Sequence, residues 1–424
     1  MRWIRFVLVL WCVVVASCGG NGHSVAPPSD LVVQETGDTQ VTLNWTAQPG
    51  VNYWVWFAPG TAMDAQNYDK TAGVSAWTNV TPPFVLKGTK SGVALTNETT
   101  YSFTVNARTG SGPGGNPANI VTAVPRLAGQ NWAAGPDVKG HALRAVTYAT
   151  LSTGLLMVGV GDAGKVLTSA DNQTWTEVAS SGTTYQLKDV AYAYGKYIAV
   201  GDAGTIIYSA DGVSWTAARS PVTQNLTAVF YNGSRLTAVG QGGTVLTSTD
   251  GASWTAVVVN GLTQDLNAVT YSLSGYWLAA GASGVVYTST DGLAWSTVSV
   301  PAEFANAYWK SAAVLTRTVT SGTTVTTTYL TALVGHSGQL MTSTDGVAWT
   351  SASAALGASL NLNKVIASTG QLMVVGDSGA VFTSPDGGVW TRRFPPSVVS
   401  LLTVIRYNNT YTAYGQSGVT VSSK

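Results

Sequence analysis

A segment that recurs six times in the C-terminal part of the chain constrains the fold more than any other feature. The copies read GDAGKVLTSADNQTW (161–175), GDAGTIIYSADGVSW (201–215), GQGGTVLTSTDGASW (240–254), GASGVVYTSTDGLAW (281–295), GHSGQLMTSTDGVAW (335–349) and GDSGAVFTSPDGGVW (376–390). A seventh copy begins as GQSGVTVSS at residue 415. The aspartates of successive copies lie 39 to 41 residues apart, except for one spacing of 54. Such a period predicts a repeat fold, in which each unit packs on its neighbours.

Each repeat contains four short runs of strand-forming residues, which the second unit shows as LKDVAYAYG, YIAVG, TIIYSA and WTAA. Four strands per unit, a to d, predict the blades of a β-propeller. Six units are complete, and the seventh has strands a (403–407), b (412–415) and c but lacks d. The segment NWAAG, 131–135, carries a Trp like each d strand and supplies the missing strand. We therefore predict that residues 131–424 form a seven-bladed propeller closed by the 131–135 strand.

The S/T-x-D-G-x-x-W part of the repeat resembles the Asp-box of bacterial neuraminidase-type (BNR) propellers, although it is one residue shorter between Asp and Trp. The resemblance implies that each Asp side chain accepts backbone N–H groups within the c–d turn. Asp readily bonds to its own turn, and a following Gly tolerates positive φ. The first copy has Asn172 in place of that Gly. Six equivalent carboxylates cannot form one active site, so we assign a structural role to Asp171, Asp211, Asp250, Asp291, Asp345 and Asp386.

The opposite face of the disc is where we expect ligands, because strand alternation places the b–c turns and the starts of the a strands there. The b–c turns contribute Asp162, Asp202, Gln241, Ala282, His336, Asp377 and Gln416. The a strands add Arg144, Lys188, Asn267, Lys310 and Asn363. One hypothesis is a polar binding surface, and the alternative is that Asp and Gln simply suit turns. Neighbouring b–c turns are too far apart to share an ion, so we predict no metal site and no cofactor.

The fifth unit departs from the others. Its d–a connection, VPAEFANAYWKS (300–311), carries Phe304 and Tyr308, and its a–b hairpin (316–330) holds 14 extra residues. Aromatic residues on a loop can anchor a partner or stack on a sugar, so Phe304 and Tyr308 join the candidate ligand-binding residues. Trp309 occupies the position of Leu187 and Leu226 and can instead belong to the core.

The segment before the propeller contains two further regions. Residues 1–18, MRWIRFVLVLWCVVVASC, combine Arg2 and Arg5 with an apolar run and end in V-A-S-C. This end resembles a bacterial lipobox, which implies a lipoprotein signal peptide and lipidation of Cys18. The alternative is an ordinary secretory signal with a chance Cys. After a linker (19–28), residues 29–125 resemble a fibronectin type III domain, with Trp45 in the second strand and Tyr101 as the corner tyrosine.

Charge and cysteine content exclude several classes of function. The formal net charge is +1 with Arg2 and Arg5 included, and the chain shows no basic stripe, so we expect no nucleic-acid partner. Cys12 and Cys18 are the two cysteines, so the chain after residue 18 has no disulfide, thiol nucleophile or cysteine-ligated metal. Gly19 follows Cys18, and this favours an exported protein that is anchored to the outer membrane of the bacterial cell envelope.

Three functions remain open from the sequence. The repeat rhythm resembles the photosystem II assembly-factor family of propellers, and this resemblance implies a scaffold that binds an envelope protein or glycan without catalysis. A sialidase-like glycoside hydrolase is the enzymatic alternative, but the propeller contains only Glu177 and Glu303 as glutamates and has no recognisable arginine triad. A purely structural surface adhesin is the third. We expect an all-β, non-enzymatic binding protein: a fibronectin type III sandwich followed by a seven-bladed propeller.

Overall fold

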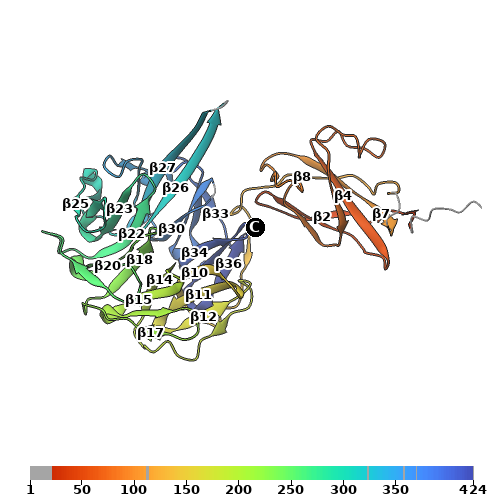
Figure 1. Cartoon of the computed structure of the whole chain (residues 1–424). Coiled ribbons are helices and arrows are strands. Elements are labelled where there is room, and N and C mark those ends of the chain that lie inside the picture. The colour runs from red at the N-terminus through yellow and green to blue at the C-terminus, as the bar shows by residue number, and fades with distance from the viewer. Residues whose placement is uncertain (1–21, 111–113, 322–323, 357–358, 369, 424) are drawn as a thin grey trace, which may run out of the picture. The chain divides into compact units, whose positions relative to one another are not determined.

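A computed structural model describes residues 22–110, 114–321, 324–356, 359–368 and 370–423. Residues 1–18, for which the sequence predicts a lipoprotein signal peptide ending at Cys18, lie outside these residues. Throughout the described chain the regular structure is β-strand with short 3-10 turns, which confirms the all-β expectation. Two compact units divide at Leu127 and Ala128 (Figure 1). No helix in the described part is long and apolar enough to cross a membrane.

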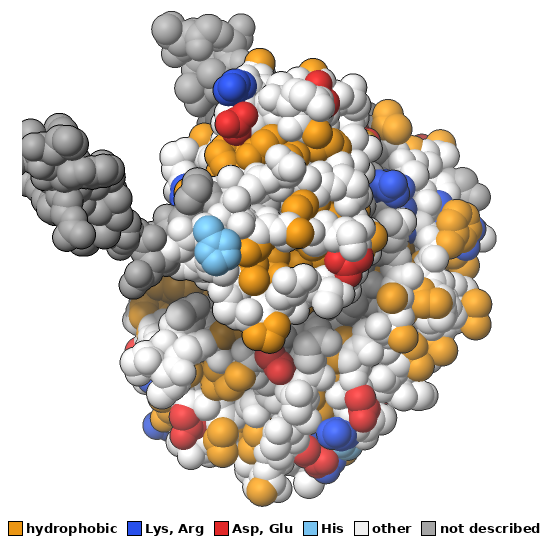
Figure 2. Space-filling model, turned by 90° about the vertical axis from the view of Figure 1, so that its right-hand side faces the viewer, with side chains coloured by type: hydrophobic (Ala, Val, Ile, Leu, Met, Phe, Trp, Pro, Cys, Tyr) orange, Lys and Arg blue, Asp and Glu red, His pale blue; other side chains and the backbone are white. Residues whose placement is uncertain are grey.

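The N-terminal unit contains two antiparallel sheets around one core. The larger sheet has the order β1 (Ser24–Val25), β7 (Tyr101–Thr109), β4 (Val51–Pro59), β5 (Ser75–Val80), with β8 (Val121–Ala123) also paired to β7. The smaller sheet consists of β2 (Val32–Gly37), β3 (Gln40–Asn44) and β6 (Phe84–Leu86). Trp45 and Tyr101 lie in the core, and the Tyr101 hydroxyl accepts the N–H of Thr96 at 3.0 Å. Charged side chains are sparse on the face shown in Figure 2.

The C-terminal unit is built from seven four-stranded antiparallel sheets. In chain order they are β10–β13 (Leu143–Leu151, Gly154–Gly161, Val166–Ser169, Thr176–Glu177), β14–β17 (Leu187–Ala193, Lys196–Gly201, Ile206–Ser209, Thr216–Ala217), β18–β21 (Leu226–Tyr231, Leu236–Gly240, Val245–Ser248, Thr255–Val257), β22–β25 (Leu266–Ser272, Tyr276–Gly281, Val286–Ser289, Ser296–Thr297), β26–β29 (Trp309–Ser321, Thr324–Gly335, Leu340–Ser343, Thr350–Ser351), β30–β33 (Leu362–Ser368, Gln371–Gly376, Val381–Ser384, Thr391–Arg393), and β34–β36 (Leu401–Tyr407, Thr410–Gly415, Thr420–Ser423) with β9 (Trp132–Ala134). We number these sheets one to seven and call their strands a to d from the innermost outward. The extra residues of sheet five extend the β26–β27 hairpin beyond its neighbours (Figure 1).

The apolar core of this unit lies between the sheets. Each of its seven buried clusters joins two adjacent sheets: the cluster with Val158 and Val190 joins sheets one and two, and the cluster with Leu340 and Leu372 joins sheets five and six. The innermost strands contact one another in succession, and β10 also contacts β34. The sheets therefore form a closed ring, which is the β-propeller fold.

Two contacts close this ring between the ends of the unit. Strand β9 pairs with β36, so that Val421 lies opposite Ala134 and Ser423 opposite Trp132. Asn172, the residue that replaces a repeat glycine, connects sheet one to sheet seven. Its side-chain amide donates to the Thr412 hydroxyl at 2.9 Å, and its side-chain oxygen accepts the Tyr414 hydroxyl. Asn172 keeps φ +60°, close to the +73° of the corresponding Gly212.

We predict that Val421→Asp destabilises the whole C-terminal unit, because Val421 is fully buried beside the closing strand. A buried carboxylate without a partner should reduce the free energy of unfolding by about 3 kcal/mol or more. Val398→Asp is the matched control, since Val398 is 85% exposed. Chemical unfolding of the two variants measures the difference. Equal stability of both variants would show that the β9–β36 contact is not needed for the ring.

Candidate functional site

The six repeat aspartates form hydrogen bonds within their own c–d turns. In each turn one carboxylate oxygen accepts the N–H groups two and three residues further along the chain; for Asp250 these are Ala252 at 2.8 Å and Ser253 at 2.7 Å. The hydroxyl of the serine two residues earlier, Ser248, donates to the same oxygen at 3.1 Å. The other five turns repeat this arrangement at Asp171, Asp211, Asp291, Asp345 and Asp386. These carboxylates hold turns and are not available as an active site.

Ionised carboxylates suit these turns, because backbone N–H donors stabilise the charged form. Hydrogen bonds from Ser214 and Val213 lower the pKa of Asp211 to about 2. The N–H of Ser253 is the largest cause that lowers the pKa of Asp250 to about 2. The negative charge of the turn is therefore part of the stability of the propeller.

The b–c turns lie close to the starts of the a strands because glycines permit it. Gly201 directly precedes the turn Asp202–Gly204, and an added Cβ there would lie 2.0 Å from the carbonyl oxygen of Gln186. The N–H of Asp202 donates to the Gln186 carbonyl at 3.0 Å, just before strand a. This close approach brings the first residue of each b–c turn beside the second residue of strand a.

A β-bulge occurs at that second residue in all seven sheets. In sheet two, Leu187 pairs with Gly201 and Asp189 pairs with Val200, which leaves Lys188 unpaired in the ladder. A bulge changes the direction in which a side chain points. The seven bulge residues line one cavity of about 310 Å³, which we call the channel mouth: Arg144, Lys188, Thr227, Asn267, Lys310, Asn363 and Leu402.

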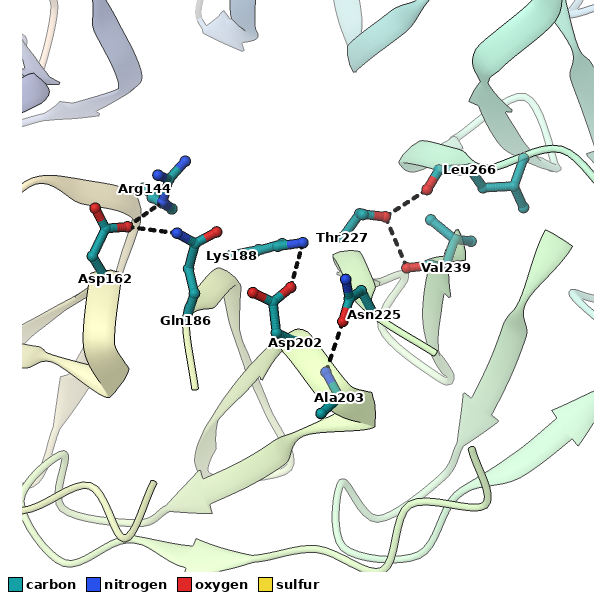
Figure 3. Close-up of polar contacts among 10 residues, drawn as sticks. All are labelled: Arg144, Asp162, Gln186, Lys188, Asp202, Ala203, Asn225, Thr227, Val239 and Leu266. Carbon is teal, nitrogen blue, oxygen red and sulfur yellow. Dashed lines mark hydrogen bonds and ion pairs between the residues drawn. The ribbon is translucent and has the colours of Figure 1, made fainter. Parts of the chain in front are cut away.

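The three uncharged polar bulge residues join adjacent sheets. Thr227 donates to the Leu266 carbonyl at 2.5 Å, as Figure 3 shows. Asn267 donates to the Trp309 carbonyl at 2.9 Å, and Asn363 to the Leu401 carbonyl at 2.9 Å. These contacts satisfy backbone oxygens of the innermost strands, so the three residues have a structural role.

The cationic bulge residues of sheets one and two pair with the b–c turns of their own sheets (Figure 3). Arg144 Nε lies 2.5 Å from Asp162 Oδ1, and Lys188 Nζ lies 2.5 Å from Asp202 Oδ1. Gln186 also donates to Asp162 at 2.8 Å. The predicted residues therefore do come together, as pairs around the mouth.

Sheet five has a different arrangement where its strand a begins beside the b–c turn. The ring of Tyr308 stacks on the imidazole of His336 with centroids 4.5 Å apart, and Lys310 Nζ lies 5.9 Å from the Tyr308 ring. Burial lowers the pKa of His336, and the positive charge of Lys310 lowers it further.

The structure corrects the prediction for Phe304, which the sequence placed on a binding loop. Phe304 is only 3% exposed and packs on Trp309, with ring centroids 5.2 Å apart, in the core between sheets four and five. A short 3-10 turn, Ala302–Phe304, directs the ring inward. Trp309 is fully buried, in agreement with its alternative assignment to the core. Tyr308 remains partly exposed and lines the mouth.

A second and larger cavity, of about 680 Å³, is lined by the a strands of all seven sheets. Asp189 and Lys364 line both this cavity and the channel mouth, so they lie where the two meet. Sequence reasoning missed these two residues. They are the third residues of their strands, and the bulge that brings them toward the channel has no sequence signal.

Asp377, the remaining predicted carboxylate, accepts hydrogen bonds from Asn361 and Asn363, each at 2.9 Å. Burial is the largest single influence and raises the pKa of Asp377, but the hydrogen bonds from Asn363, Asn361 and Ser400, together with His336, lower it overall. Within the described ranges, no three His, Cys, Asp or Glu residues converge in a way that could hold a metal ion. The mouth therefore presents cations, amides and one aromatic pair, and the carboxylates around it are already hydrogen-bonded or ion-paired within the chain.

Comparison with known proteins supports the β-propeller class. A family model described as the DUF6242 beta propeller domain matches residues 126–266. The search of curated proteins gave no significant match.

Solved structures show the same fold at low identity. The structure of YCF48 bound to a D1 peptide is 14% identical, with a TM-score of 0.53 over 70% of this chain and 96% of that chain. A catalytically inactive virginiamycin B lyase from Staphylococcus aureus with quinupristin is 8% identical, with a TM-score of 0.54 over 69% and 99%. The WD40 propeller domain of Doa1 is 12% identical, with a TM-score of 0.50 over 69% and 97%. These likenesses concern the fold alone.

We predict that Asp250→Asn lowers the stability of the propeller at neutral pH and makes that stability depend less on pH in the acidic range. The lowered pKa means that the ionised carboxylate stabilises the fold above its ordinary value of 3.8 and loses this contribution as pH falls through about 2. Asn keeps an acceptor but has no charge to titrate. Thermal unfolding from neutral pH to about pH 2 measures the effect. Glu303→Gln, at an exposed position, is the control and should leave the loss of stability at acidic pH unchanged.

Proposed function

We propose that this protein is an exported, lipid-anchored scaffold of the bacterial cell envelope, and that it binds a protein partner through the face around the channel mouth. In this proposal the seven sheets are the blades of one seven-bladed propeller. The observation that carries it is the ring of bulges, because all seven innermost strands turn a side chain into the same mouth. A partner on the axis can thus contact every blade at once.

The titratable groups support binding over catalysis. A glycoside hydrolase needs a carboxylic acid with a raised pKa to protonate the leaving group. Within the described chain, every carboxyl group whose pKa shifts is shifted downward, Asp377 included. Among the described residues no hydrogen bond orients the His336 imidazole, and the Tyr308 ring covers one of its faces. A general base of the histidine type normally needs such an orienting partner.

One of the solved structures of this fold supports a binding role. YCF48 was captured with a peptide of D1, so a propeller of this fold can hold a polypeptide. We infer the same type of ligand for this chain, and the face that we assign to it is the mouth. A glycan remains the alternative partner.

The N-terminal unit fits a fibronectin type III-like spacer in this proposal. The buried Trp45 and the Tyr101 hydroxyl bonded to the upstream backbone at Thr96 are the features that support it. Such a spacer would separate the propeller from the lipid attached to Cys18.

We predict that Lys188→Ala reduces capture of the partner from the native envelope by about tenfold or more, because loss of one member of a close ion pair leaves Asp202 unpaired at the interface. Lys196→Ala is a matched control. Lys196 belongs to the same sheet, but its ammonium group contacts the carbonyl of Asp250 in a c–d turn. Crosslinked pull-down with the soluble chain from Gly19 measures both. Lys188→Arg, which keeps the charge, should retain capture.

Equal capture by both alanine variants would place the contact surface elsewhere. If the wild-type chain captures no defined protein or polysaccharide, the binding function is wrong and the structural adhesin becomes the better assignment.

We further predict that Cys18→Ala releases the protein from the membrane, because the thioether-linked lipid is the only anchor in the proposal. Membrane fractionation and metabolic labelling with a fatty acid measure this outcome. A Cys12→Ala variant, with the same loss of a thiol within the apolar run, should stay membrane-bound and labelled. Fatty-acid labelling of the Cys18→Ala chain equal to that of the wild type would contradict the lipid anchor.

A further inference from the structure

The channel mouth follows a pairing rule that one sheet breaks. Where a bulge residue is cationic in sheets one and two, the first residue of the b–c turn in the same sheet is a carboxylate: Arg144 faces Asp162, and Lys188 faces Asp202. Sheet five has the third cationic bulge residue, Lys310, but its b–c turn begins with His336. An imidazole is neutral or cationic, so the sheet supplies no counter-ion for Lys310.

No other sheet replaces the missing carboxylate. Asp377, in the next b–c turn, is held by the side chains of Asn361 and Asn363. Among the described residues, Lys310 has no carboxylate within 4.0 Å. Burial lowers the pKa of Lys310, and the charges of Arg144 and Lys188 lower it further, while Asp377 acts in the opposite direction. Lys310 is thus a half-buried ammonium group that lines the same cavity as Arg144 and Lys188, and among the described residues it has no carboxylate partner.

The remaining charged residues that line the mouth are Lys364, which adds a further positive charge, and the carboxylates Asp189 and Asp265. Asp189 accepts the N–H groups of Val190 and Val229, at 3.0 and 2.9 Å, and Asp265 accepts that of Gly242 at 2.9 Å. These two carboxylates therefore hold backbone.

We propose that the channel mouth binds a carboxylate from an acidic segment of the protein partner, and that Lys310 is its counter-ion. This inference rests on the proposed function and names the chemical group that the partner presents. The partner's carboxylate would form an ion pair with Lys310 in sheet five, equivalent to the ion pairs that sheets one and two form within the chain. The cavity, of about 310 Å³, has room for an acidic side chain, and Tyr308 gives such a side chain an aromatic wall.

A restoring substitution tests this directly. His336→Asp reproduces the arrangement of sheets one and two, so the chain itself would satisfy Lys310. The probe is a short glutamate-containing peptide with blocked termini, and its glutamine counterpart and inorganic phosphate serve as comparison ligands. NMR titration of the Lys310 side chain and calorimetry follow binding. For the wild type we expect the glutamate peptide to bind and to raise the Lys310 pKa, while the glutamine peptide does neither.

In the His336→Asp variant we expect a raised Lys310 pKa without any ligand, and binding of the glutamate peptide weakened by about tenfold or more. Lys310→Met should weaken binding similarly, and Lys196→Met, which removes a charge elsewhere, should leave it unchanged. Undiminished binding by Lys310→Met would overturn the proposal, as would preferential binding of phosphate, which would indicate a site for a free anion.

The two proposals fail in different ways. If the wild-type chain captures its envelope partner and Lys310→Met and His336→Asp capture it equally well, the scaffold function stands and the carboxylate inference is wrong. If the wild-type chain captures no partner, the scaffold function is wrong, and the inference, which names a group of that partner, is overturned with it.

Discussion

Apolar packing between neighbouring sheets is the interaction on which the C-terminal unit depends. No four-stranded sheet here has a core of its own, because each buried cluster takes residues from two sheets. A sheet gains its stability only inside the ring, so the ring must close. Closure depends on β9, which precedes sheet one and pairs with β36 of sheet seven, and on Asn172, which connects Thr412 and Tyr414 to sheet one.

The channel mouth is a consequence of the same packing. Glycines of the repeat allow each b–c turn to lie against the start of strand a. Strand a has a β-bulge there, and the bulge directs the side chain of its second residue toward the axis of the ring. Seven equivalent positions then differ only in side-chain chemistry. Neutral residues such as Asn267 became inter-sheet contacts, and cationic residues such as Lys188 became ion pairs. Function can therefore change at one position without a change of fold.

Much of this could be predicted from residues that act locally. The four strands of each unit and the turn aspartates depend on residues of the same repeat. Local hydrogen bonds such as those of Asp250 follow from turn chemistry. The face that carries Arg144, Asp162, Lys188 and Asp202 followed from strand alternation alone. The burial of Phe304 did not follow, because its ring packs on sheets four and five together.

By itself the sequence determined the class of fold, the role of the repeat aspartates and the face on which polar residues gather. Only the tertiary structure decided which of those residues have partners. Whether a cation meets a carboxylate depends on ångström-scale distances between a bulge and a turn that lie far apart along the chain, as for Lys310 and His336. Backbone bulges and inter-sheet packing set these distances, so the composition of the chain and the spacing of its motifs do not reveal them.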